Sequence, residues 1–217
     1  METEIIIATA ALIVSLLGFA WSLYERLKLE KKKLAIEMLK EWNNNTSADT
    51  EVLRSNYPGQ YDKCVPLAIN EVDKIIHPDK LSNHEMKKYI DIKVAIIRLL
   101  NYFEYVSAAF NRGSVDKKII RNSFSVTMLR YYIVLRNFMI MQFLVSKRNH
   151  WRPFTKHLKS LILKREKLVC AGCTDDSCIL KLDGQSSRVK LIDLLNKGNL
   201  NENDISEMKK ELDSKSI

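Results

Sequence analysis

The chain has 217 residues, 46% of them hydrophobic, a share that excludes a disordered protein, and its six Gly and four Pro indicate long helices joined by few turns. The net charge of +9 suits either nucleic acid or an anionic membrane surface as a partner. Four unevenly spaced cysteines do not suit a secreted disulfide scaffold and indicate a reduced, cytoplasmic domain.

An uncharged stretch from Ile5 to Leu23 predicts a membrane-spanning helix. As a helix it rises about 28 Å, close to the hydrocarbon thickness of a bilayer. A cleaved signal peptide is the alternative, since the segment 18–20 offers small residues at a cleavage spacing. Glu2 and Glu4 stand where a signal peptide carries Lys or Arg, and the stretch exceeds the usual apolar region of about 7–15 residues. The anchor is therefore favoured.

Positive charge follows the predicted span and does not precede it. Basic flanks stay in the cytoplasm, so we expect a bacterial inner-membrane protein with its N-terminus outside and its C-terminal domain in the cytoplasm. Trp21 and Tyr24 lie at the inner boundary, where amphipathic rings prefer to sit. Anionic headgroups attract each nearby basic residue by about 1 kcal/mol. The residues predicted to meet headgroups are Arg26, Lys28, Lys31, Lys32 and Lys33.

Small residues recur along the predicted span every three or four positions. Such a stripe lets two helices approach closely in lipid, where van der Waals contact drives association. The alternative is chance, because small residues are common in membrane helices. The homo-oligomer interface predicted here consists of Ala8, Ala11, Ser15, Gly18 and Ser22.

The span is expected to continue as a juxtamembrane helix to about residue 45, where an Asn-rich segment breaks it. A poorly defined stretch then leads to Pro66, followed by a short helix over 66–76 that ends before Pro78. A capping box of Ser82 and Glu85 opens the clearest helix in the sequence.

That helix is expected to stop at Gly113, and Ser114 to cap a second long helix over 115–147. A tight turn between them predicts antiparallel neighbours. The second helix is apolar enough to resemble another span, but Arg130 and Arg136 would be expensive in lipid, so a buried core helix is favoured. One more helix is expected over 151–168.

The predicted fold is all-α: one transmembrane helix, its juxtamembrane continuation and a cytoplasmic helical bundle. We expect the bundle to be followed by a tail with two short helices near 187–196 and 203–213. The predicted divisions of the chain are residues 1–24, 25–45, 46–168 and 169–217.

The tail carries the most metal-like spacing, with Cys170 and Cys173 two residues apart and Cys178 close behind. A closed zinc site needs a fourth ligand, which Cys64 or His157 would have to supply from elsewhere. Ordinary reduced thiols are the commoner outcome, so we expect no metal and no cofactor.

Polar residues on the two long helices suggest a structural network that fixes their register, because buried charge is costly unless paired. The predicted members are Arg98, Asn101, Glu104, Arg136 and Asn137. A catalytic or ligand-binding role is the alternative. The sequence contains no HExxH, GxxxxGK[ST] or GxSxG motif, so we expect no enzyme and no catalytic residues.

A strongly basic stretch follows the second long helix. Its charges could meet nucleic-acid phosphates or lie near anionic lipid. Since no nucleic-acid module is recognisable, the lipid reading is favoured. The basic residues are Lys147, Arg148, Arg152, Lys156, Lys159, Lys164, Arg165 and Lys167.

Three short motifs together resemble the bacterial DUF4760 family over roughly residues 5–165. They are Arg98-Leu-Leu-Asn101-Tyr102-Phe103-Glu104, Gly113-Ser-Val115-Asp116 and Trp151-Arg-Pro-Phe154. The resemblance implies an N-terminal membrane helix joined to a helical domain. It implies no reaction and no catalytic residues, and it does not reach the Cys-containing tail.

Three hypotheses for function follow. The leading one is a membrane-anchored interaction or scaffold protein that self-assembles and presents its helical domain to an unknown cytoplasmic protein. The second is a membrane effector of an anti-phage or toxin system that acts by clustering and membrane disruption. The third is a membrane-tethered nucleic-acid binder that uses the basic stretch 147–167.

Overall fold

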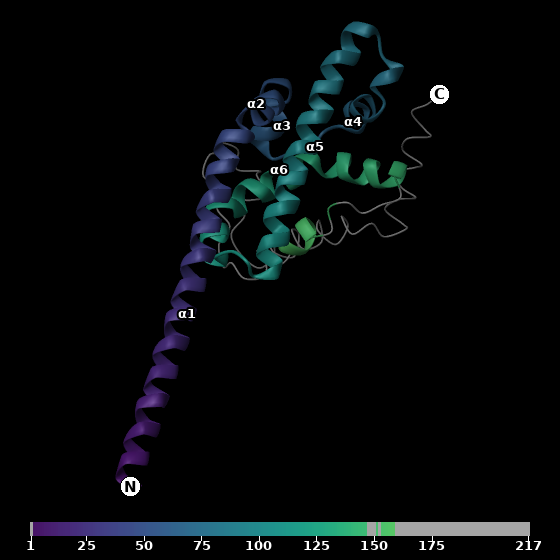
Figure 1. Ribbon diagram of the computed structural model, residues 1–217. Coiled ribbons are helices and arrows are strands. Elements are labelled where there is room, and N and C mark those ends of the chain that lie inside the picture. Colours follow the sequence, from purple (N-terminus) through teal and green to yellow (C-terminus); the bar gives the residue numbers. More distant parts are fainter. Residues whose placement is uncertain (1, 147–150, 152, 159–217) are drawn as a thin grey trace.

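The computed structural model describes residues 2–146, 151 and 153–158, and Figure 1 shows them as a helical domain from which one long helix projects. No strand occurs among these residues, which confirms the all-α prediction. The elements in chain order are α1 (Glu2–Asn45), α2 (Ser47–Asn56), α3 (Pro58–Lys63), α4 (Ile69–Ile76), the 3-10 turn η1 (Pro78–Lys80), α5 (Asn83–Arg112) and α6 (Lys117–Ser146).

The helix α1 joins the predicted span and the juxtamembrane segment without a break. Its 44 residues rise about 66 Å. The apolar side chains from Ile5 to Tyr24 point into open space, whereas Ala35 and Met38 are buried in the domain. Within the described residues, α1 is the one helix long and apolar enough to cross a membrane.

The stretch expected to be poorly defined is helical, so that prediction was wrong. α1 ends at Asn45, and a single bend at Thr46 separates it from α2. The Thr46 side chain does not cap α2; its hydroxyl donates back to the Trp42 carbonyl oxygen. Leu53 of α2 and Tyr61 of α3 are buried, so packing against the domain stabilises two helices that are too short to be stable alone.

The ends of α4 and α5 lie close to their predicted places. α4 ends before His77-Pro78, and α5 begins after Ser82. The Ser82 hydroxyl donates to the Glu85 carboxylate at 2.8 Å instead of accepting a backbone N–H, so the two predicted residues bond to each other and the Ser82 side chain does not cap α5. At the other end, Gly113 adopts a left-handed conformation with φ of 73°, which glycine reaches without strain.

The turn between α5 and α6 differs from its prediction in two ways. Ser114 donates its hydroxyl to the Ala109 carbonyl oxygen at the end of α5, and Asp116 caps α6 by accepting from the Lys118 and Ile119 amides at 2.9 and 3.1 Å. α6 then crosses α5 in Figure 1 and also contacts α1 and α4, so the expected side-by-side hairpin does not form.

The core is an aromatic cluster to which α1, α5 and α6 contribute. The Trp42 indole lies 5.1 Å from the Phe103 ring and 5.2 Å from the Phe124 ring, between centroids. Phe154, from the described turn of helix over 153–158, stacks on Phe103 at 5.4 Å. Since Phe124 and much of the rest of α6 are buried here, α6 is the core helix that its arginines predict.

Candidate functional site

The small-residue stripe lies on the exposed part of α1. All five of its residues are accessible. The Ser15 hydroxyl donates to the Ala11 carbonyl oxygen at 2.9 Å, so it needs no partner from outside the helix. A Cβ placed on Gly18 would meet no atom within 4 Å. The described residues therefore leave this face open, while association through it stays a prediction.

Beyond the span, the basic flank is partly paired along α1. Arg26 lies 3.2 Å from Glu30, and Lys28 lies 3.2 Å from Glu25. The pair of Lys33 with Glu37 is longer, at 3.9 Å. Such exposed pairs contribute only about 0–1 kcal/mol, so they exchange easily for a lipid phosphate. Lys31 and Lys32 are exposed and form no ion pair with any described residue.

A groove of about 320 Å³ lies between this flank and the α5–α6 turn. The turn is fixed to α1 because the Asp116 amide donates to the Lys31 carbonyl oxygen at 3.0 Å. The residues that line the groove are Tyr24, Leu27, Lys28, Lys31, Val115, Asp116 and Lys117. This site could not be predicted from the sequence, since Lys31 and Lys117 are 86 positions apart.

The predicted polar network resolves into separate contacts. Arg98 lies 3.7 Å from Asp49 of α2, and the Asn137 amide donates to the Leu67 carbonyl oxygen at 2.7 Å. Glu104 accepts the Phe154 backbone N–H at 3.1 Å, and burial raises the pKa of its carboxyl.

Of the two remaining predicted members, Asn101 is exposed and Arg136 is half-buried on α6. The predicted network is therefore replaced by three polar contacts, which tie α2, the segment before α4, and the segment 153–158 to the two long helices.

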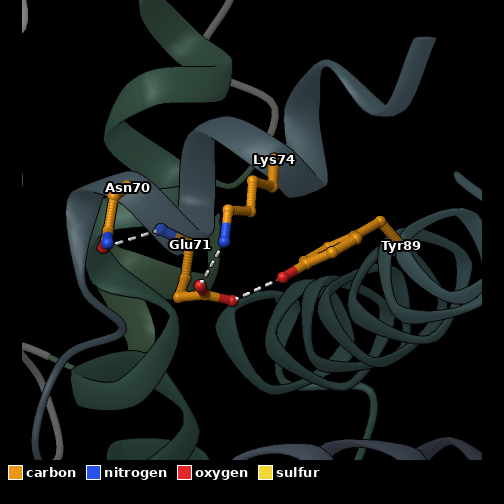
Figure 2. A network of polar contacts seen from close by, with 4 residues as sticks. All are labelled: Asn70, Glu71, Lys74 and Tyr89. Carbon is orange, nitrogen blue, oxygen red and sulfur yellow. Dashed lines mark hydrogen bonds and ion pairs between the residues drawn. The ribbon is translucent and has the colours of Figure 1, made fainter. Parts of the chain in front are cut away.

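A polar cluster that the sequence did not reveal joins α4 to α5, as Figure 2 shows. Glu71 accepts from the Lys74 ammonium at 3.0 Å and from the Tyr89 hydroxyl at 2.9 Å. The Asn70 side chain accepts the Glu71 backbone N–H at 2.9 Å. Burial opposes ionisation of Glu71, but the hydrogen bonds from Lys74 and Tyr89 outweigh it and lower the pKa of the carboxyl. The cluster keeps a charged carboxylate between two helices and so fixes their contact.

Ser107 and His157 form a hydrogen-bonded pair of a kind that catalysis often uses. The Ser107 oxygen lies 3.0 Å from Nδ1 of His157, and the imidazole stacks on the Phe110 ring at 3.9 Å between centroids. Burial, aided by the charges of Arg121 and Lys117, lowers the pKa of His157 to about 4. Both side chains are 0% exposed, so no substrate reaches the Ser107 hydroxyl in this conformation. The pair holds the segment 153–158 against α5.

Comparison with known proteins gives one match. A family model described as a domain of unknown function, DUF4760, matches residues 5–159. The chain belongs to the DUF4760 family. The match takes in α1 as well as the packed helices, so the apolar helix is part of the DUF4760 domain. No curated protein and no solved structure matches the chain.

The DUF4760 domain also contains a polar pocket of about 240 Å³ where α1 meets α2. The Trp42 and Tyr131 side chains line it together with several hydroxyl groups. Arg54 donates to the Tyr61 hydroxyl at 3.0 Å beside it. These groups can donate and accept hydrogen bonds to a small polar molecule. Their spacing in the sequence carries no recognisable motif.

The candidate metal ligands Cys170, Cys173 and Cys178 lie outside the described residues, as does most of the basic stretch 147–167. Cys64 is buried at the end of α3. Among the described side chains of the DUF4760 domain, no group of three His, Cys, Asp or Glu residues is placed to hold a metal ion.

Proposed function

We propose that this DUF4760 protein is a single-pass membrane protein that self-associates through α1 and presents its helical domain to a protein partner in the bacterial cytoplasm. One observation carries the proposal. The helix that exposes an apolar surface from Ile5 to Tyr24 is the same unbroken helix that buries Ala35 and Met38 in the domain core.

Insertion of α1 into a bilayer accounts for that exposed surface. Side chains such as Ile7 and Val14, each 69% exposed, would be costly in water over so long a contiguous stretch. The same length of helix suits the hydrocarbon core. The basic residues from Arg26 onward support a cytoplasmic position for the domain, because basic flanks tend to stay on that side of the membrane.

Self-association would cover the open stripe with the same stripe of a second copy of the chain. Gly18 and the small residues on its side leave room for the backbone of a second span. Because α1 continues into the core, two joined spans would also hold two domains at a fixed separation. This arrangement suits a scaffold, and we propose a binding role without enzymatic chemistry.

The experiment measures the mass of the full-length protein in a mild detergent by light scattering. We expect a dimer or higher oligomer for the parent. Gly18→Ile should shift it toward monomer, because the added side chain fills the space that a neighbouring backbone would occupy. Leu16→Ile, an equally apolar change off the stripe, is the control and should leave the mass unchanged. A monomeric parent, or an unchanged oligomer for Gly18→Ile, would contradict the proposal.

Topology is tested separately with a reporter fused after Ile217. Cytoplasmic activity of the reporter is expected. A periplasmic C-terminus, or a mature chain beginning near Trp21, would overturn the proposed location.

A further inference from the structure

The groove between α1 and the α5–α6 turn lies at a specific depth relative to the predicted span. Tyr24 directly follows the span, Lys28 lies about 8 Å beyond Leu23 along the helix axis, and Lys31 about 12 Å beyond it. The headgroup region of one leaflet is about 5–8 Å thick. Side chains on a helix lean toward its N-terminus, so Lys28 and Lys31 lean back toward the bilayer. The groove therefore opens at headgroup depth.

The domain reaches this depth through the α5–α6 turn. Figure 1 shows the turn as the edge of the domain that lies beside the middle of α1. The hydrogen bond from the Asp116 amide to the Lys31 carbonyl oxygen fixes it there at 3.0 Å. Lys117, at the start of α6, thereby joins two lysines of α1 around a single groove.

The groove is positively charged, and two of its three lysines are free to bind an anion. Lys28 is paired with Glu25, but Lys31 and Lys117 form no ion pair with a residue that the structure describes. The Lys117 ammonium lies 5.3 Å from the centre of the Phe110 ring, a contact that leaves its N–H groups able to donate. The one acidic lining residue, Asp116, directs its carboxylate to the backbone amides of α6.

The apolar lining completes the site. Leu27 and Val115 line the groove together with Tyr24 and the lysines. A volume of about 320 Å³ falls at the small end of the range for small-molecule pockets, about 300–1,000 Å³. A phosphate ester attached to the start of two acyl chains combines the charge and the apolar surface that these residues offer.

We propose that this groove is a binding site for the phosphate headgroup of an anionic glycerophospholipid. Lys28, Lys31 and Lys117 bind the phosphate, and Leu27 and Val115 contact the first carbons of the acyl chains. The site would tie the orientation of the domain to the lipid composition of its leaflet. This inference rests on the part of the proposed function in which α1 spans the bilayer.

The test is a titration of the full-length protein in a neutral detergent with dioctanoyl phosphatidylglycerol, followed by native mass spectrometry. Dioctanoyl phosphatidylcholine, with the same chains and no net charge, is the matched probe. We expect the anionic lipid to bind more tightly, and Lys31→Gln or Lys117→Gln to weaken it about fivefold each. Lys32→Gln and Lys118→Gln remove equal charges just outside the groove and should change the affinity less than twofold.

A variant that is expected to tighten lipid binding completes the test, because a loss of folding could only weaken binding. Asp116→Asn preserves a side chain that caps helices well and removes the acidic charge from the groove, so binding should tighten about twofold. Equal weakening by all four lysine variants, equal binding of phosphatidylcholine, or displacement of the lipid by millimolar inorganic phosphate would each overturn the proposal. Carbonate extraction of cell membranes that contain the parent protein tests insertion of α1 separately, so failure of the groove and failure of the anchor are distinguishable.

Discussion

The helices α1 and α6 are equally hydrophobic on average over their lengths, yet the chain places them in opposite surroundings. α1 concentrates its apolar residues in one uncharged block, none of which is buried against the part of the chain that the structure describes. α6 spreads arginines through its apolar residues, and Arg130 lies with its guanidinium 5.1 Å from the centre of the Tyr61 ring. Arrangement of charge, more than total hydrophobicity, separates a membrane helix from a core helix.

The largest expected difference between the two helices comes from deleting the same side chain in each. Phe124→Ala in α6 empties a site that contacts both the Trp42 and the Phe103 rings and should lower the free energy of unfolding by about 3–5 kcal/mol. Phe19→Ala in α1 removes a side chain that is 65% exposed and should change it by less than about 0.5 kcal/mol. Urea denaturation of the full-length protein in detergent measures both, and equal losses would break the comparison.

A charge placed in α1 tests the membrane side of the comparison. Leu12→Arg puts an arginine near the centre of the predicted span, at a cost of about 2.5–3.5 kcal/mol for insertion. We expect a large share of the protein to be extracted from membranes by carbonate. Ile36→Arg makes a comparable change on the same helix beyond the span, where the side chain is 46% exposed, and should leave the protein in the membrane. Retention of both variants would argue against α1 as the anchor.

Acid should destabilise the packed helical domain, because His157 is buried in it. The pKa of this imidazole is lowered from 6.5 to about 4 in the fold. Between these pH values the unfolded chain binds a proton that the folded chain does not, so the free energy of unfolding falls as the pH is lowered through that window. The loss attributable to His157 should reach about 3 kcal/mol at pH 4.

The measurement for His157 is urea denaturation at pH 7, 5.5 and 4 for the parent and for His157→Gln. Glutamine can still hydrogen-bond to Ser107 but does not titrate, so the variant should lose less stability on acidification. A pH dependence identical to that of the parent would show that His157 does not carry the effect.

The smallest expected effect concerns the other contact of the segment 153–158. Glu104→Ala leaves the Phe154 amide without its acceptor and should cost about 1–2 kcal/mol. Glu104→Gln keeps an acceptor and removes a charge that burial disfavours, so it should stay within about 0.5 kcal/mol of the parent in thermal unfolding at pH 7. A loss of several kcal/mol for both variants would instead indicate the charge pair that the sequence suggested.

Much of the fold was predictable because it depends on local patterns. Each of three features depends only on residues close together in the sequence. They are the uncharged block of α1, the end of α5 at Gly113 and the arginines of α6. The helices α2 and α3 were not predictable, because Leu53 and Tyr61 acquire their packing partners only in the folded domain. Asp116, not Ser114, caps α6, a choice that the backbone of the turn makes between two suitable residues.

The candidate sites show the same division. The stripe on α1 follows from helical spacing, so it could be placed from the sequence alone. In the groove, Lys31 and Lys117 are brought together by a backbone hydrogen bond between distant segments. No pattern of side chains in the sequence predicts such a bond. The predicted network failed for a related reason: Arg98 and Asn137 face α2 and the Leu67 carbonyl oxygen, partners that spacing on α5 and α6 does not reveal.

Because α1 is continuous, the number of residues between Gly18 and Met38 determines the angle between the stripe and the domain about the helix axis. Each residue of an α-helix turns the chain by about 100°, so one alanine inserted after Leu23 would rotate the whole domain by that angle relative to the stripe. Seven inserted residues would return it to within about 20° of its original phase. In an assembly joined through the stripe, helical phase thus decides which faces of neighbouring domains look toward one another. A partner that binds across two domains would tolerate a seven-residue insertion far better than an insertion of one or two.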